Sequence, residues 1–305
     1  MANGKPAISV IIASVNGPPM IVECLAALAA QQGSVDAEVI VADASDESTR
    51  HLIAARFPWV RLIASADRRS IPELRAQGLR DARGDIIAVI EDHCLAQPDW
   101  YQEILRTHQA HPECVAVGGA IENGSCERLV DWAVFFCEYS AFMPPLPRGL
   151  ATSIAGNNVS YKRQAFRDLA PTDDVLTRGF WEATLHNELR ARGERFFVEP
   201  SIIVRHKKRF GVGYFVQQRY HYSRFYAGSR LVGASPGVRL FRGAATLGLP
   251  PVLFARIAVC VLRKRQNVTR FLLAAPLLVL FTAVWAAGEV VGALLGPADS
   301  LRRIE

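Results

Sequence analysis

The sequence predicts an α/β domain with a mostly parallel sheet covered by helices on both faces, followed by a C-terminal helical region. In the first 200 residues, apolar runs of about five residues alternate with segments whose apolar residues recur at helical spacing. After residue 200 the composition changes, because residues 200–305 hold 16 Lys and Arg against 3 Asp and Glu. An acidic globular domain joined to a basic, apolar region explains both patterns.

Each expected strand is a β-rich apolar run, and each expected helix begins near a proline or a polar turn. The run 114–121 is the last strand of the regular alternation, and two short strands are expected around 196–204. The expected strands are 8–14, 38–42, 60–64, 86–90, 114–121 and a short one within 156–163. The expected helices are 20–32, 51–57, 72–82, 98–109, 180–193 and 211–230.

Polar residues follow the expected strands directly, where parallel sheets bind their ligands. Glu91, Asp92 and His93 follow the strand 86–90. Alternate residues of an extended segment point the same way, so Glu91 and His93 can face one ligand. A carboxylate suits a ribose hydroxyl or a hard cation, and an imidazole suits Mn²⁺ better than Mg²⁺. A helix N-cap beside an unrelated histidine is the alternative.

Two further groups lie at the same edge of the expected sheet. Asp43 follows the strand 38–42 and could accept a hydrogen bond from a base or ribose, or merely cap the next helix. Arg68, Arg69 and Arg75 could contact phosphates, although a solvated basic face is the commoner outcome for such residues.

Taken in order, these motifs resemble glycosyltransferase family 2, the inverting sugar transferases of the GT-A fold, over about residues 7–207. SVIIASVNG is similar to the family's first strand and nucleotide loop, and VIVADASDEST is similar to its second strand. LRAQGLRDARGDIIAVIEDH resembles the run from the "ARNxG" helix to the DxD motif. Arg75 then matches the Arg, Gln77 the Asn, and Glu91 and His93 the two acids of DxD.

The resemblance implies a nucleotide-sugar donor, with UDP as the expected nucleotide, and a divalent metal, Mn²⁺ or Mg²⁺. The implied metal ligands are His93, Asp92 and His206. The implied catalytic base is Glu182, since Trp181-Glu182 takes the place of the family's Glu-Asp pair, eleven residues before Gly193. The residues implied to bind the nucleotide-sugar are Ala13, Ser14, Asn16, Asp43, Arg68, Arg75, Glu91 and Asp92.

Acceptor contacts are expected from two regions. Asn157 and Asn158 lie in GNNVSYKR, which is similar to the stretch beside the family's acceptor site, and Trp181 precedes the base. In the helix 211–230, Gln218, Arg219 and Arg224 offer hydrogen-bond donors to a phosphate or a sugar. An amphipathic helix on a membrane surface is the favoured interpretation of that helix.

Two apolar stretches, 244–262 and 271–295, complete the chain, and the second carries a single charge. It is a candidate membrane span, whereas prolines and an arginine interrupt the first. We expect a catalytic domain over 1–207, a basic interfacial region over 208–243 and membrane-associated helices over 244–305. Basic residues interleaved with apolar ones favour membrane lipids over nucleic acid as the partner.

The sequence thus predicts a membrane-anchored inverting glycosyltransferase at the inner, cytoplasmic membrane with its catalytic domain facing the cytoplasm. The expected acceptor is a lipid-linked or cell-envelope glycan. The departures from DxD and from the Glu-Asp pair keep a second hypothesis open, a non-catalytic membrane subunit that retains the fold to bind a nucleotide or partner.

Overall fold

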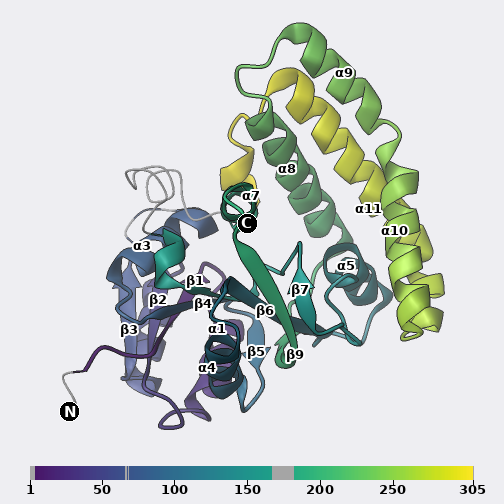
Figure 1. Ribbon diagram of the computed structural model, residues 1–305. Coiled ribbons are helices and arrows are strands. Elements are labelled where there is room, and N and C mark those ends of the chain that lie inside the picture. The colour runs from purple at the N-terminus through teal and green to yellow at the C-terminus, as the bar shows by residue number, and fades with distance from the viewer. Residues whose placement is uncertain (1–3, 66, 68, 167–181, 305) are drawn as a thin grey trace. The chain divides into compact units, whose positions relative to one another are not determined.

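The computed structural model describes residues 4–65, 67, 69–166 and 182–304 (Figure 1). The chain divides into two compact units, each with its own packing. The first unit comprises residues 1–124 and 142–207, and the second comprises residues 125–141 and 208–305. The segment 125–141, which the sequence places in the globular domain, therefore packs with the C-terminal helices.

A single sheet organises the first unit (Figure 1). Its strand order is β3-β2-β1-β4-β8-β6-β9-β5, and β7 pairs with β9. The block β3-β2-β1-β4 is parallel, as the sequence predicts, and β8 enters antiparallel between β4 and β6. The strands are β1 (Ile8–Ser14), β2 (Ala37–Asp43), β3 (Val60–Ala64), β4 (Ile86–Ile90), β5 (Cys94–Ala96), β6 (Cys114–Asn123), β7 (Gly149–Ala151), β8 (Asn158–Lys162) and β9 (Arg195–His206).

Helices cover this sheet because their apolar faces need a partner. Residues of α3 and α7 pack with β1, β4, β6 and β8 in one buried core, in which Tyr161 and Leu185 are fully enclosed. The helices of the unit are α1 (Met20–Ala29), α2 (Glu47–Arg56), α3 (Ile71–Asp81), α4 (Trp100–Ala110), the 3₁₀ turn η1 (Arg163–Phe166) and α7 (Glu182–Ala191).

One long strand replaces the two short strands expected around 196–204. β9 runs for twelve residues and pairs with β6 through a register shift between Gly118 and Ala120. Its last residues also pair with β5, a three-residue antiparallel strand that the sequence does not indicate. This pairing sets His206 opposite Cys94, next to the turn after β4.

The second unit is entirely helical among the residues that the structure describes. α8 matches the helix expected at 211–230, and α9 and α10 meet at a bend of 50°. α11 is the one described helix that is by itself long and apolar enough to cross a membrane. The helices are α5 (Leu129–Tyr139), α8 (Val212–Arg230), α9 (Pro236–Thr246), α10 (Leu249–Lys264), α11 (Val268–Leu295) and the 3₁₀ turn η2 (Ser300–Arg303).

The buried histidine of α4 makes the stability of the first unit depend on pH. His108 Nε2 lies 2.9 Å from Ser160 Oγ, and burial together with the charge of Lys162 lowers the pKa of His108 to about 3. An unfolded histidine has a pKa of about 6.5. The contribution of His108 to the free energy of unfolding is therefore complete above pH 6.5. It falls, by up to about 1.4 kcal/mol per pH unit, as the pH drops toward 3.

We predict that His108→Gln flattens this decline between pH 6.5 and 5, because the substituted side chain binds no proton on unfolding. Urea unfolding of the wild type and the variant at several pH values measures the difference. His51→Gln, at an exposed position of α2, is the matched control and should keep the wild-type slope. Equal slopes in all three proteins would contradict the account.

Candidate active site

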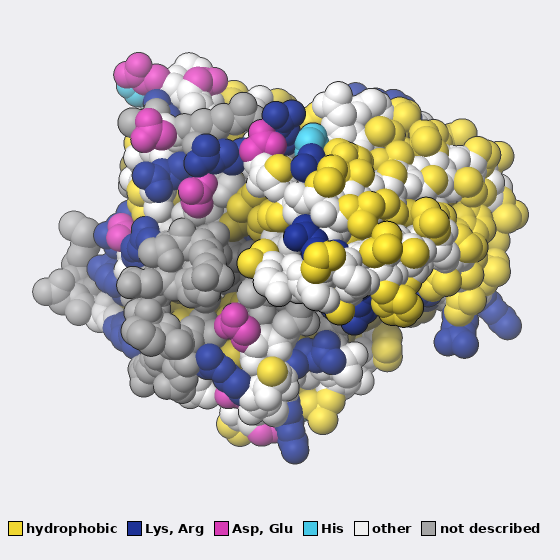
Figure 2. All heavy atoms as spheres, turned by 90° about the horizontal axis from the view of Figure 1, so that it is seen from above, with side chains coloured by type: hydrophobic (Ala, Val, Ile, Leu, Met, Phe, Trp, Pro, Cys, Tyr) yellow, Lys and Arg dark blue, Asp and Glu magenta, His cyan; other side chains and the backbone are white. Residues whose placement is uncertain are grey.

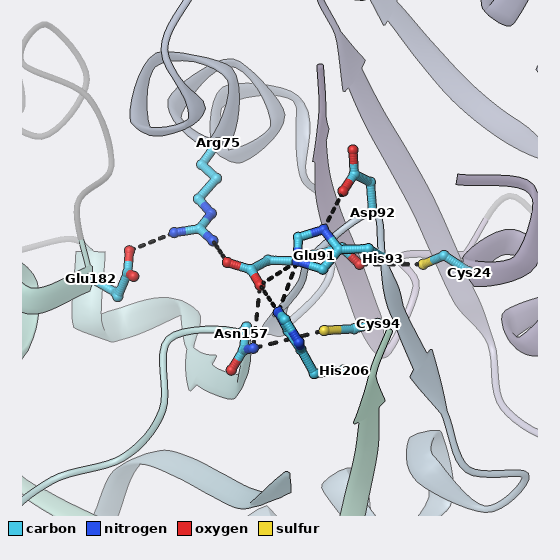
Figure 3. A network of polar contacts seen from close by, with 9 residues as sticks. All are labelled: Cys24, Arg75, Glu91, Asp92, His93, Cys94, Asn157, Glu182 and His206. Atoms are coloured by element: carbon cyan, nitrogen blue, oxygen red, sulfur yellow. Dashed lines mark hydrogen bonds and ion pairs between the residues drawn. The ribbon is translucent and has the colours of Figure 1, made fainter. Parts of the chain in front are cut away.

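The turn after β4 carries the central group of polar side chains (Figure 3). Among the described residues, Glu91, His93 and His206 each offer one ligand atom, and these atoms all lie within 4.8 Å of one another. His93 Nε2 is 3.0 Å from His206 Nε2 and 3.2 Å from Glu91 Oε2. Glu91 Oε2 is 3.9 Å from His206 Nε2. A β-turn, closed by the Cys94 N–H donating to the Glu91 carbonyl at 3.0 Å, brings Glu91 and His93 together, and the β5–β9 pairing supplies His206.

These spacings fit a divalent ion. Ligand atoms about 2.1 Å from a metal lie about 3.0 Å apart at right angles and about 3.5 Å apart in a tetrahedron. One carboxylate and two imidazoles form a donor set that suits Mn²⁺, Fe²⁺, Co²⁺ or Zn²⁺ better than Mg²⁺. The buried amide oxygen Oδ1 of Asn157, whose Nδ2 lies 3.3 Å from Glu91 Oε2, has no hydrogen-bond partner among the described residues. Asn157 turns Nδ2 and not Oδ1 toward Glu91, so the described donor set is two imidazole nitrogens and one carboxylate oxygen.

Asp92 lies outside the cluster, although the sequence predicts it as a metal ligand. Its Oδ1 is 2.6 Å from His93 Nδ1, on the side of the ring that faces away from His206 (Figure 3). A proton on Nδ1 that is donated to Asp92 leaves the lone pair of Nε2 for a metal. Asp92 is therefore placed to fix the tautomer and orientation of a ligand.

The cluster is strongly polarised. Although burial alone would lower the pKa of His93, the hydrogen bonds and negative charges of Asp92 and Glu91 raise it to about 9. Burial likewise opposes ionisation of Glu91, but the hydrogen bond and charge of His93 and the charges of Arg75 and His206 hold its pKa well below the usual range. Glu91 is thus a permanent carboxylate beside His93, which is an imidazolium at neutral pH and must release its Nε2 proton when it binds a metal.

Arg75 joins this cluster to the candidate base. Its guanidinium is buried and donates from Nη1 to Glu182 Oε2 at 2.5 Å, and its Nη2 lies 3.5 Å from Glu91 Oε1. Glu182, at the start of α7, packs against Gly156, where a Cβ would come within 2.2 Å of the Glu182 side chain. The sequence predicts Arg75 as a phosphate contact, whereas here it bridges two carboxylates (Figure 3).

The residues expected at the nucleotide lie at the carboxyl ends of β1 and β2. Ser14 is fully buried, and its Oγ has no hydrogen-bond partner among the described residues, so it could serve a ligand. Ala13 is buried beside it and Asn16 is exposed. Asp43 is fully enclosed, with its carboxylate bonded to Ser45 Oγ and to Arg50 Nη1. Arg68 lies outside the described residues, as does Trp181, which was expected at the acceptor.

Among the remaining acceptor candidates, Asn158, Arg219 and Arg224 each have a hydrogen-bond partner within their own unit. Asn158 is fully buried, and its amide binds two backbone oxygens and the Trp100 indole, which assigns it to the scaffold of the sheet. Arg219 donates to Glu138 at 2.7 Å and lies over three aromatic rings of the second unit. Gln218 is buried, and Arg224 donates to the Gly296 carbonyl.

We predict that Asp92→Asn weakens Mn²⁺ binding about 10- to 100-fold, because the hydrogen-bond partners of metal-bound histidines contribute that much. Titration of the purified protein followed by the electron paramagnetic resonance signal of free Mn²⁺ measures the affinity. Asp99→Asn, next to α4, is the control and should bind as the wild type does. Wild-type affinity in Asp92→Asn would show that His93 needs no such partner.

Two curated proteins are similar to part of this chain. One curated relative is a glucosyl-dolichyl phosphate glucuronosyltransferase of Haloferax volcanii, 29% identical over 37% of this chain and 38% of its own length. Another is the succinoglycan biosynthesis protein ExoO of Rhizobium meliloti, 32% identical over 37% of this chain and 32% of its own length. The chain therefore matches only about a third of each curated relative.

A solved structure extends the likeness to nearly the whole chain. It is the mannosyltransferase PcManGT of Pyrobaculum calidifontis, determined with GDP-mannose and Mn²⁺. The match has a TM-score of 0.59 at 18% identity and covers 95% of this chain and 88% of that protein, which shows a common fold. The family model for glycosyl transferase family 2 matches residues 9–169, more than half of the sequence. The chain is therefore a member of glycosyl transferase family 2.

Proposed function

We propose that the protein transfers a sugar, with inversion, from a UDP-sugar to a lipid-linked or cell-envelope glycan. The observation that carries this proposal is the position of Glu182, a carboxylate held by Arg75 beside the Glu91–His93–His206 group in a family 2 fold. The names of the two relatives, which mention dolichyl phosphate and succinoglycan, support an acceptor of this class.

Each residue then has a role that its chemistry allows. Ser14 and Asp43, at the ends of β1 and β2, lie where the nucleoside would bind. Glu91, His93 and His206 would hold the ion, with Asp92 orienting His93. A divalent ion, when bound, offsets the negative charge of the diphosphate leaving group.

Glu182 is the proposed base. It takes the proton of the acceptor hydroxyl while that oxygen attacks the anomeric carbon, and the nucleoside diphosphate leaves from the opposite face. The single displacement breaks one bond at the anomeric carbon and forms one, so the configuration inverts. The side chain of Glu182 is 29% exposed, so an acceptor can reach it. Arg75 keeps the carboxylate pointed toward the ion site.

We also propose a location at the inner, cytoplasmic membrane, with the catalytic unit on the cytoplasmic side. The apolar helix α11 and the absence of any acidic residue between Glu199 and Glu289 support it. Basic segments beside apolar ones are attracted to the anionic lipids of the cytoplasmic leaflet.

Glu182→Gln should lower sugar transfer at least about 100-fold, because positioned general bases contribute about 10² to 10⁴ in rate. A donor screen by nucleotide release, on detergent-solubilised protein with and without lipid extract, identifies the substrates for this measurement. Glu188→Gln, on the same helix, is the matched control. Mn²⁺-dependent UDP binding should be unchanged in both variants.

Two outcomes would contradict the proposal. Near-normal turnover of Glu182→Gln would show that Glu182 is not the base, and it would favour an acceptor that attacks as an ionised phosphate. Metal-dependent nucleotide binding by the wild type without release from any donor would favour the non-catalytic subunit.

A further inference from the structure

The second unit carries nearly all of the exposed apolar side chains that the structure describes. Every large exposed hydrophobic residue except Leu150 lies in this unit. On α11 alone, exposed leucines and valines extend from Leu272 to Leu295. We call the exposed apolar residues of α9, α10, α11 and the turn between α9 and α10 the apolar face, and Figure 2 shows a broad area of yellow side chains. Its members are Val238, Leu240, Phe241, Leu247, Val252, Val259, Leu262, Leu272, Leu273, Val279, Leu280, Leu294 and Leu295.

An apolar face of this size is expected to contact lipid or another protein surface. Soluble proteins rarely expose apolar patches larger than a few hundred Å². The stripe on α11 spans 24 residues, about 36 Å of helix, which would suffice to cross the roughly 30 Å hydrocarbon core of a bilayer. Length and composition therefore allow α11 either to cross the membrane or to lie along its surface.

The opposite side of α11 is occupied from end to end. Near its start, Phe271 packs against Phe136 of α5. Near its middle, Phe281 packs on Phe215 of α8, with the two ring centroids 4.6 Å apart. Toward its end α11 meets the backbone of α8, since a Cβ at Gly292 would lie 2.3 Å from the Arg224 carbonyl. α11 therefore cannot enter a bilayer unless α5 and α8 enter with it.

The helices α8 and α10, which pack with α11, carry side chains that are too polar for a hydrocarbon environment. On α8, the amide of Gln217 is exposed, and His221 and Arg224 are half-buried. Arg256 is exposed in the middle of α10, which packs beside α11 through Phe254 and Phe271. Charged and polar side chains at membrane depth are expensive unless they face a protein interior. When the helices lie flat, the polar groups of α8 can face water or headgroups. Arg256 lies one helical turn from Val252, on the apolar face itself, where its long side chain can extend to the headgroups.

Basic residues border the apolar face at both ends of α11. At its C-terminus, Arg239 donates to the Ala293 carbonyl, and Arg302 and Arg303 follow in η2. At the junction with α10 lie Arg263, Lys264, Arg265 and Arg270. The described acids of this unit are fewer and each has a partner, as in the pairs Arg209–Glu127, Arg128–Asp131, Arg219–Glu138, Trp285–Glu289 and Arg303–Asp299. An excess of arginine and lysine around an apolar surface matches an anionic leaflet.

We infer that α11 lies in the plane of a single anionic leaflet and does not cross the bilayer. The apolar face sits among the acyl chains, and the basic residues at both ends of α11 sit at the level of the headgroups. This inference rests on the proposed membrane location, but it is independent of the proposed reaction.

The topology test asks whether the two ends of α11 lie on the same side of the membrane. Gln266→Cys and Ala298→Cys, both at exposed positions, are made separately in the full chain with the exposed Cys126 changed to Ser. A membrane-impermeant maleimide is added to sealed membrane vesicles of both orientations. Labelling of both positions in one orientation, and of neither in the other, is the expected result. Labelling in opposite orientations would overturn the inference.

The binding test uses vesicles of phosphatidylglycerol and phosphatidylcholine. Leu273→Glu combined with Leu280→Glu should lower binding to mixed vesicles at least about tenfold, because two apolar contacts are replaced by anionic side chains. Leu150→Glu, outside the second unit, is the matched control and should bind as the wild type does. Binding should also weaken on pure phosphatidylcholine.

The vesicle-binding measurement also distinguishes a lipid surface from a second copy of the chain as the partner of the apolar face. Binding that the double variant retains in full would contradict the inference, as would a wild-type dimer that shields the face and does not bind vesicles. Nucleotide release in detergent reports the proposed reaction separately, so a failure of either proposal can be recognised.

Discussion

The site depends on one buried, positively charged side chain, that of Arg75. The Arg75 guanidinium on α3 lies between Glu91, which follows β4, and Glu182, which begins α7. A buried charge without partners would be strongly unfavourable, so the two carboxylates stabilise Arg75 as much as Arg75 orients them. The same contacts set the spacing between the candidate base and the Glu91–His93–His206 group. Arg75 therefore contacts both the carboxylate proposed to hold the ion and the carboxylate proposed to accept the proton.

Much of this site could be predicted from the sequence, because it follows from the architecture of a parallel sheet. Apolar runs of five residues identify the strands, and the polar residues that follow them must lie at one edge. Ser14, Asp43 and Glu91 lie at that edge as expected. Glu91 and His93 also lie side by side as expected, although a β-turn closed by the Cys94 N–H and the Glu91 carbonyl brings them together, and not the expected extended segment.

What the sequence could not provide depends on long-range packing. The pairing of β5 with β9 brings His206 to the cluster, and nothing in the three residues of β5 indicates a strand. The orientation of Asp92 toward Nδ1 of His93 and the bridging role of Arg75 require the folded positions of α3 and α7. Asn158 lies next to Asn157 but points into the sheet, where its amide is saturated. For α11, hydropathy reports length and composition, whereas its partners α5 and α8 decide which side is available to lipid.

The central claim is that a Glu-x-His turn with a distant histidine replaces two acids as a metal site. Pulsed electron paramagnetic resonance of Mn²⁺ bound to the protein together with UDP tests it most directly, because the nuclear modulation counts coordinated imidazoles. The account predicts couplings from two histidine nitrogens, of which one is lost in His206→Ala and one in His93→Ala. Bound Mn²⁺ that shows no imidazole nitrogen would contradict it.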